Sequence, residues 1–262
     1  MGYKTQKLYE DTYLIRDTAE EALYLIERNN KAYLIDTGMD HDSLKEEIEK
    51  FTNLPVIVLL THGHIDHIGM SGEFDDVYMD PKDLDVYRIH MNMHEGNFES
   101  EGLCFKQPEE IKPVKQQYDD LKVIPLPGHT PGSIIILDPH NKAVYTGDAI
   151  GSGCGVWMQI PYALTIPEYK AGLETAVEEL EKNGVDDTWK FHGGHYGQEN
   201  MSQVQRPNPL TLQLIKDMME LCDRLMHHEK QDFTEVNFIS DGKPFYTAWK
   251  TAEMILTKER IV

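Results

Sequence analysis

The stretch that decides the fold is Thr61-His62-Gly63-His64-Ile65-Asp66-His67-Ile68-Gly69, which directly follows an apolar run at residues 56–60. A continuous apolar run of this length is typical of a strand that is buried on both faces. The first two histidines are two residues apart, so an extended backbone directs both side chains to one face. The carboxylate and the third histidine follow after a change of direction. Together these imidazole and carboxylate donors suit zinc, with iron or manganese as alternatives.

Chance does not explain this cluster of histidines. Histidine accounts for 12 of the 262 residues. At that frequency, three fixed positions are all histidine in roughly one window out of 10⁴. The aspartate among them makes a chance occurrence rarer still, so the stretch is a candidate metal site.

Three further segments each place one candidate ligand just beyond a predicted strand. They are Pro127-Gly128-His129-Thr130-Pro131-Gly132, Thr146-Gly147-Asp148-Ala149 and His192-Gly193-Gly194-His195-Tyr196-Gly197. Their glycines permit a tight backbone turn at the ligand. Each segment alone is a weak signal, and it is their order along the chain that points to one common site.

Elements predicted outward from the histidine stretch alternate between strands and helices. A hairpin is predicted at residues 22–36 around Asn29-Asn30, because two strand-like runs flank a two-residue turn. Helices are predicted at 41–51, 84–91, 167–182 and 209–230, and strands at 122–126, 133–137, 143–146, 187–192 and 245–258. Strands mixed with helices, without a strict β-α-β rhythm, favour an α/β (α+β) fold in which helices pack outside sheets.

Length and composition favour one globular domain over residues 1–262. Residues 92–120 have weak periodicity, and we expect an insertion or lid there. Residues 207–262 are expected to form a C-terminal helix followed by strands. The helix at 209–230 carries a wide apolar stripe, which either packs on a sheet or supports a homo-oligomer.

Charge and apolar content exclude several classes of protein. The formal net charge of −20 disfavours nucleic-acid and membrane-surface partners. No apolar run approaches the roughly 20 residues that span a bilayer. The first residues lack the apolar segment of a secretory signal, and three cysteines without a C-x-x-C pair disfavour a disulfide framework. We therefore expect a cytoplasmic protein.

From Leu34-Ile35-Asp36-Thr37-Gly38 to about His195, the sequence resembles the metallo-β-lactamase fold superfamily. The resemblance implies an αββα four-layer sandwich with a dinuclear metal site at the edge of its two sheets. Matched residue by residue, it implies a first metal on His62, His64 and His129, a second on Asp66, His67 and His195, and Asp148 as the bridge. Asp36 matches a position that supports the metal loops.

Several positions of this sequence distinguish between branches of the superfamily. His64 stands where flavodiiron oxygen reductases carry glutamate, which favours zinc hydrolysis over redox iron chemistry. Asp148 stands where zinc β-lactamases carry cysteine or serine, which disfavours antibiotic hydrolysis. An aspartate at this position is similar to the glyoxalase II, lactonase and phosphodiesterase branches. The block His195-Tyr196-Gly197 differs from the His-Glu-Tyr-Thr block typical of glyoxalase II, which disfavours glutathione thioesters. RNA-processing members of the superfamily are larger and carry basic surfaces, so the net charge of −20 disfavours that branch.

These implications predict a hydrolase that uses two divalent metal ions, zinc before iron or manganese. A metal-bridging water is ionised near neutral pH, since coordination lowers its pKa to about 7. The predicted substrate is a small molecule with a carbonyl group: a lactone, an ester or a thioester. Asp66 is the predicted catalytic residue because it is placed to accept or relay a proton. A small-molecule phosphodiesterase with the same site is the alternative, and a non-catalytic metal-binding sensor is a third.

The sequence predicts the substrate pocket less specifically than the metal ligands. Residues 152–162 follow Asp148 and mix glycines with large apolar groups, including Trp157, so they are predicted to form an apolar wall. Tyr162 or Tyr196 is a candidate hydrogen-bond donor to an oxyanion. His90 and His94 are expected either at the entrance or in a solvated loop.

Overall fold

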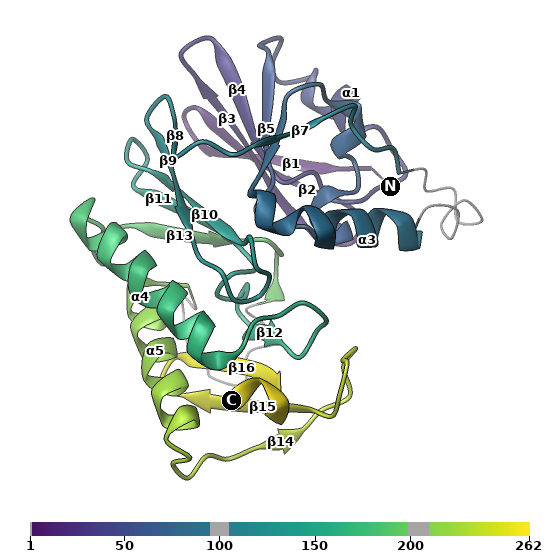
Figure 1. The fold of residues 1–262 in the computed structure, drawn as a ribbon. Coiled ribbons are helices and arrows are strands. Elements are labelled where there is room, and N and C mark those ends of the chain that lie inside the picture. Colours follow the sequence, from purple (N-terminus) through teal and green to yellow (C-terminus); the bar gives the residue numbers. More distant parts are fainter. Residues whose placement is uncertain (1, 95–104, 199–209) are drawn as a thin grey trace. The chain divides into compact units, whose positions relative to one another are not determined.

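The computed structural model describes residues 2–94, 105–198 and 210–262. The chain divides into two compact units (Figure 1). The first unit contains Met1–Asp120 together with Gly194–Tyr196, and the second contains Leu121–Gly193 and Gly197–Val262. The single domain expected over residues 1–262 stays a prediction.

The first unit is built on a sheet with the strand order β1-β2-β3-β4-β5-β6-β7. Neighbouring strands are antiparallel from β1 to β4 and parallel from β4 to β7. The strands are β1 (Lys4–Tyr9), β2 (Thr12–Arg16), β3 (Ala22–Arg28), β4 (Lys31–Ile35), β5 (Val56–Leu59), β6 (Val77–Met79) and β7 (Ile111–Pro113). The short β8 (Gln117–Tyr118) ends the first part of this unit.

The predicted hairpin is confirmed as β3 and β4. Asn29 and Asn30 both have positive φ, at 48° and 61°, as a tight two-residue hairpin turn requires. β4 then pairs in parallel with β5, with Ile35 opposite Leu59. The carboxyl ends of these two strands therefore lie side by side, and the histidine stretch begins just after β5.

Short helices cover this sheet. They are α1 (Leu44–Ile48), α2 (Ile65–Ile68), the 3-10 turns η1 (Ser71–Glu73) and η2 (Pro81–Asp83), and α3 (Leu84–His94). Ser43 caps α1, since its side chain accepts a hydrogen bond from the Glu46 N–H at 3.2 Å. α1 is shorter than the helix predicted at 41–51, because Asp40 and Ser43 hold the preceding residues in turns.

The segment predicted as an insertion at 92–120 contains ordered elements. α3 extends to His94, and β7 pairs in parallel with β6. Residues 95–104 lie outside the described residues. Strands as short as β7 and β8 carry too few residues to show a periodicity, which explains why the sequence did not reveal them.

The second unit contains strands of two sheets. One has the order β13-β11-β10-β9, and the other has the order β12-β16-β15-β14. Their bounds are β9 (Leu121–Pro125), β10 (Ile134–Asp138), β11 (Ala143–Gly147), β12 (Val156–Met158), β13 (Lys190–Gly193), β14 (Thr234–Glu235), β15 (Pro244–Trp249) and β16 (Ala252–Thr257). The strand character at 245–258 thus resolves into a hairpin, and the loop predicted at 152–162 contains a strand.

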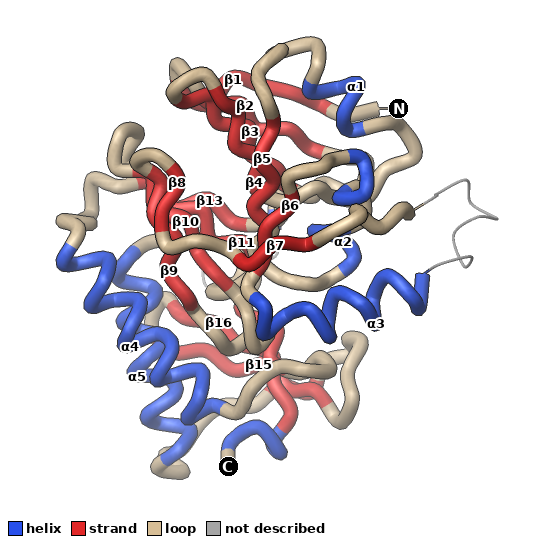
Figure 2. Tube along the Cα trace, turned by 45° about the horizontal axis from the view of Figure 1, so that its top comes forward, coloured by secondary structure: helices blue, strands red, loops and turns tan. Residues whose placement is uncertain are grey.

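Two long helices, α4 (Ile166–Lys182) and α5 (Leu212–Met226), run side by side in this unit (Figure 2). α4 begins at Thr165, whose N–H and hydroxyl both donate to the Glu168 carboxylate. Thr211 caps α5 by accepting from the Leu214 N–H at 3.1 Å. The positive charge of Lys182 in the last turn of α4 interacts favourably with the negative end of the helix dipole.

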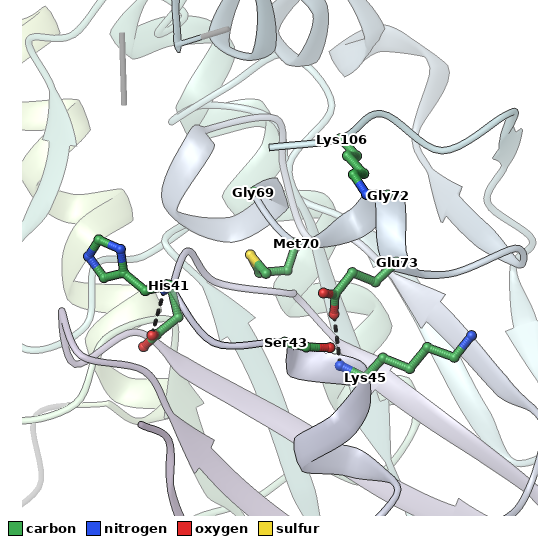
Figure 3. Close-up of a pocket in the computed structure, with 9 residues that line it drawn as sticks. His41, Ser43, Lys45, Gly69, Met70, Gly72, Glu73 and Lys106 are labelled. Carbon is green, nitrogen blue, oxygen red and sulfur yellow. Dashed lines mark hydrogen bonds between the residues drawn. The ribbon is translucent and has the colours of Figure 1, made fainter. Parts of the chain in front are cut away.

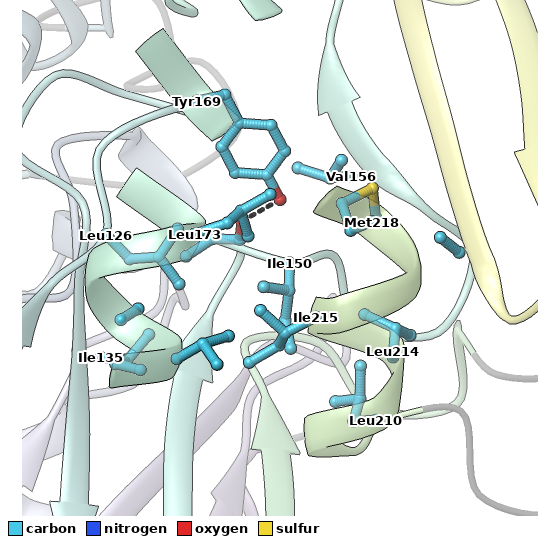
Figure 4. Packing of buried hydrophobic residues seen from close by; sticks show 14 of the residues in the cluster. Leu126, Ile135, Ile150, Val156, Tyr169, Leu173, Leu210, Leu214, Ile215 and Met218 are labelled. Carbon is cyan, nitrogen blue, oxygen red and sulfur yellow. Dashed lines mark hydrogen bonds between the residues drawn. The ribbon is translucent and has the colours of Figure 1, made fainter. Parts of the chain in front are cut away.

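The apolar stripe of α5 is buried inside the second unit (Figure 4). Its members Leu214, Met218, Leu221, Cys222 and Leu225 all belong to one hydrophobic cluster, and so does Leu210, which precedes the helix. The stripe therefore packs within the unit and does not offer a face to a second copy. Tyr169 crosses the same core, and its hydroxyl donates to the Ala149 carbonyl at 2.8 Å.

In the described ranges, no helix combines the length and the apolar character that a bilayer crossing requires.

The core of the second unit gives a direct test of these helix positions. Leu221 is fully buried in the cluster. We expect Leu221→Ala to lower the free energy of unfolding by about 3 kcal/mol through the lost contacts and the cavity left behind. Glu178→Ala, on the exposed face of α4, is the control and should change it by less than about 0.5 kcal/mol. Urea unfolding measures both, and equal values would contradict this packing.

Candidate metal centre

In the first unit, the end of β5 and the start of α2 bring three histidines together. His62 lies just after β5, and His64 is the residue that caps α2. The ring centroid of His62 lies 4.7 Å from that of His64 and 4.2 Å from that of His67. All three side chains are buried. The spacing in the sequence thus produces the cluster that it predicted.

His195 joins this group through a backbone pairing with the start of β3. Residues Glu21 and His195 form an antiparallel bridge. On either side of it, the Ala22 N–H donates to the Gly194 carbonyl at 2.7 Å, and the Tyr196 N–H donates to the Glu20 carbonyl at 2.8 Å. These bonds explain why this late segment belongs to the first unit.

Asp66 lies between two of the imidazoles. Its Oδ2 atom is 3.6 Å from the Nε2 atom of His67 and 3.6 Å from the Nε2 atom of His195. One donor atom from each of these three residues falls within 4.8 Å of the others. Two imidazole nitrogens and a carboxylate oxygen at this separation can hold one divalent ion.

Asp36 holds the histidine loop in place through hydrogen bonds to Thr61 and a contact with His67. Its Oδ1 accepts from the Thr61 N–H at 2.7 Å, and its Oδ2 accepts from the Thr61 hydroxyl at 2.7 Å. The same Oδ2 lies 2.9 Å from Nδ1 of His67. Because the Thr61 hydroxyl donates to Asp36, its oxygen accepts from Nδ1 of His62 at 3.1 Å.

The second unit carries the other two predicted ligands. Asp148 directly follows β11, and its Oδ2 lies 3.8 Å from Nε2 of His129. The Trp157 carbonyl accepts from Nδ1 of His129 at 2.8 Å, and the Ser152 hydroxyl donates to Asp148 at 3.3 Å. These contacts fix the orientation of both side chains within this unit.

The hydrogen bonds of the histidines fit the binding of a metal. His62, His67 and His129 each donate Nδ1–H to an oxygen acceptor, so each presents the lone pair of Nε2. Histidines that ligate metals are held in this way by a carboxylate, a hydroxyl or a backbone carbonyl. The donor set of nitrogen and carboxylate oxygen atoms suits zinc, iron or manganese.

Sequence reasoning missed two carboxylates beside the ligands. Asp83, buried in η2, accepts from the Gly63 N–H at 2.7 Å and so holds the backbone between two ligands. Glu21 lies with its Oε1 atom 3.6 Å from Nδ1 of His195. Burial and, to a smaller degree, the charge of the neighbouring Asp17 raise the pKa of the Glu21 carboxyl to about 8. Neither residue lies in a motif, so only the fold reveals them.

The entrance candidate His90 lies on α3, not in a loop. Its ring centroid is 4.8 Å from that of His64, and its Nδ1 accepts from the Ile65 N–H at 3.4 Å. It is therefore a neighbour of the metal-binding stretch. The side chain of His94 lies outside the described residues.

The candidate substrate residues have different surroundings. Tyr162 and Tyr196 are both exposed, and the Arg16 guanidinium lies 3.9 Å from the ring centroid of Tyr196.

Burial raises the pKa of the Cys154 thiol to about 11, so it is a neutral thiol near pH 7. Burial lowers the pKa of His192 to about 4, and its ring stacks on Tyr145.

A cavity of about 420 Å³ opens in the first unit next to the ends of α1 and α2 (Figure 3). Lys45, Lys106 and Glu73 line it, and the Glu73 carboxylate accepts from the Lys45 N–H at 2.8 Å. Met70 also lines it. The predicted ligands are not among its lining residues, so this cavity is separate from the metal cluster.

Comparison with known proteins agrees with these observations. The profile of the Metallo-beta-lactamase superfamily matches residues 21–195. Hydroxyacylglutathione hydrolase GloC of Haemophilus influenzae is 25% identical over 194 residues, which cover 68% of this chain and 86% of that protein. Acyl-coenzyme A thioesterase MBLAC2 of Homo sapiens is 23% identical over 215 residues, covering 70% and 76%.

Solved structures show the same fold. The crystal structure of TTHA1623 in a di-iron-bound form has a TM-score of 0.54 and 24% identity, and the match covers 74% of this chain and 92% of that one. The α/β class predicted from the sequence is confirmed. The chain belongs to the metallo-beta-lactamase superfamily, whose members typically bind divalent metals and are generally hydrolases.

Proposed function

We propose that this chain is a cytoplasmic hydrolase that holds two divalent metal ions, with zinc preferred over iron and manganese. Its ligands are the residues predicted from the superfamily: His62, His64, Asp66, His67, His129, Asp148 and His195. The substrate is a small molecule with a carbonyl group, namely a lactone, an ester or a thioester.

The observation that carries this proposal is the convergence of Asp66, His67 and His195. Their donor atoms lie within 4.8 Å of one another, although His195 comes from a segment far along the chain. The contact of His67 with Asp36 supports a ligand role, because it presents Nε2 toward the cluster. In the second unit, the contact between His129 and Asp148 supports the remaining part of the ligand set.

Bound divalent ions supply a Lewis acid and lower the pKa of coordinated water to about 7. Asp66 is 27% exposed at its side chain, whereas His67 beside it is 1% exposed. Asp66 is thus the member of the cluster that a proton from solvent or substrate reaches most easily. We assign it the role of proton acceptor and relay.

The choice of a carbonyl substrate rests on the surroundings of His129. Its partner Trp157 belongs to an apolar strand, and apolar residues suit the carbon skeleton of an ester better than a phosphate. One relative is named as a thioesterase and another as a hydrolase of hydroxyacylglutathione, which supports esters and thioesters at low identity.

Elemental analysis combined with a hydrolysis panel tests the proposal. The panel contains a lactone, a thioester, an aryl ester and bis-(p-nitrophenyl) phosphate. We expect near two metal ions per chain and turnover of at least one carbonyl substrate. Turnover of the phosphodiester alone would favour a phosphodiesterase, and full metal content without any turnover would favour a metal-binding sensor. Less than one ion per metal-replete chain would contradict the ligand set.

Asp66→Asn tests the catalytic role. We expect kcat to fall by at least about 100-fold, because general acid–base groups typically contribute that much. Asp66 lies partly exposed at the start of α2, so the thermal unfolding midpoint should shift by only about 4 °C or less. Metal content is measured on the same sample. Unchanged kcat at full metal content would rule out the proton role.

Asp36→Asn tests the support of the ligands. The amide keeps only one oxygen, so it cannot accept both from the Thr61 N–H at the Oδ1 position and from the Thr61 hydroxyl and His67 at the Oδ2 position. We expect zinc affinity, measured by competition with a chromophoric chelator, to fall by about 10- to 100-fold. Asp85→Asn makes the same change of charge on the exposed face of α3 and should leave the affinity unchanged. Equal affinities for both variants would show that Asp36 is not needed.

A further inference from the structure

Glu21 carries a buried carboxyl group to which the proposed function assigns no role. It stands directly before β3 in the first unit and is 5% exposed. Among the described residues, its enclosed Oε2 atom has no hydrogen-bond partner. A buried polar atom without a partner costs free energy. The presence of a carboxyl group at this place therefore needs an explanation from the residues around it.

The Oε1 atom of Glu21 faces the imidazole of His195. It lies 3.6 Å from Nδ1 of that ring, and Nε2 of the same ring lies 3.6 Å from Oδ2 of Asp66. His195 therefore has Glu21 at one ring nitrogen and the candidate metal cluster at the other. The distance to Glu21 is longer than a hydrogen bond, as is common for the contacts of catalytic groups before a ligand binds.

His67 stands between two carboxyl groups in the same way. Its Nδ1 lies 2.9 Å from Oδ2 of Asp36, and its Nε2 lies 3.6 Å from Oδ2 of Asp66. Both imidazoles that approach Asp66 thus have a buried carboxyl group at the opposite ring nitrogen. A group in this position fixes the tautomer and the ring orientation of a histidine that ligates a metal.

The backbone at Glu21 is tied to the loop that follows Asp36. Asp17 is fully buried, and its Oδ1 accepts from the Glu21 N–H at 3.0 Å. The Oδ2 atom of Asp17 accepts from the Met39 N–H at 2.9 Å. The antiparallel bridge between Glu21 and His195 then joins the late segment to this network. The backbones of Glu21 and His195 are therefore fixed relative to each other.

We propose that Glu21 is a positioning residue, which holds the His195 imidazole with Nε2 directed at Asp66 and so strengthens the binding of one of the two proposed ions. The inference rests on the proposed function and adds to it a residue outside the ligand set. An acceptor at Nδ1 keeps the proton on that nitrogen and leaves the lone pair of Nε2 for an ion. Because His195 is assigned to only one of the two ions, the loss of Glu21 should weaken one binding step and spare the other.

Zinc titration of the full metal-free chain against a chromophoric chelator tests this role, because it gives two successive dissociation constants. Glu21→Leu removes both oxygens, whereas Glu21→Gln keeps one oxygen that can accept from Nδ1. Glu47→Leu is the matched control. Glu47 is also a buried glutamate of the first unit, at 8% exposure, and its carboxylate accepts from Thr5 and Lys50.

We expect Glu21→Leu to raise one zinc dissociation constant by about 10- to 100-fold and to leave the other within about twofold. Glu21→Gln should raise the same constant by a smaller factor, since its amide oxygen still accepts. Glu47→Leu should change neither constant. In the cobalt-loaded chain, Glu21→Leu should shift the visible absorption of one ion, because the orientation of one of its ligands changes.

A second comparison separates an effect on His195 from an effect on the fold as a whole. In the His195→Ala background, Glu21→Gln should change the affected constant by less than about twofold, because the ring on which Glu21 acts is absent. This double-mutant cycle uses the variant closest in size to glutamate, so it decides the question even where Glu21→Leu does not fold.

Several outcomes would overturn the inference. If the wild type binds two ions and both Glu21 variants keep both constants, Glu21 has no role in binding and the proposed function still stands. An equal loss with and without the His195 imidazole would show that Glu21 supports the fold and does not act through that ring. A wild-type chain that binds less than one ion would instead contradict the ligand set of the proposed function itself.

Discussion

The histidine stretch depends on the hydrogen bonds that the Asp36 carboxylate accepts. Asp36 stands at the end of β4, next to the end of β5, because these strands are parallel neighbours. From there it accepts from the backbone and hydroxyl of Thr61 and contacts the ring of His67. The buried carboxylate of Asp36 thereby determines the path of the loop and the ring orientation of His67. It also orients the ring of His62, because the Thr61 hydroxyl that donates to Asp36 accepts from Nδ1 of His62.

This arrangement has an energetic cost that its hydrogen bonds offset. Asp36 is buried, and its φ of 58° lies in the left-handed region that few side chains accept. A buried carboxylate is tolerated when its oxygens are fully hydrogen-bonded. The sheet of the first unit supplies the rigidity that holds such a residue.

The sequence predicted the parts of the molecule that are local. The hairpin at Asn29-Asn30, the long helices α4 and α5 and the histidine stretch all follow from short-range patterns. It could not predict β7 or β12, which are too short for a period and exist because a neighbouring strand pairs with them. Glu21 and Asp83 were missed as neighbours of the candidate ligands, because long-range pairing and packing bring them there. The ligand assignment across both units came from resemblance and stays a prediction.

The membership of Gly194–Tyr196 in the first unit has a consequence for how the protein is made. During synthesis, the chain up to Asp120 emerges first and can begin to fold by itself. Its cluster of His62, His64, Asp66 and His67 still lacks His195 at that stage, because the bridge to Glu21 forms only after residues 121–193 of the second unit have been made. The nascent first unit therefore holds an incomplete set of candidate donor groups, and the order of translation leaves the set incomplete until residue 195 has been synthesised.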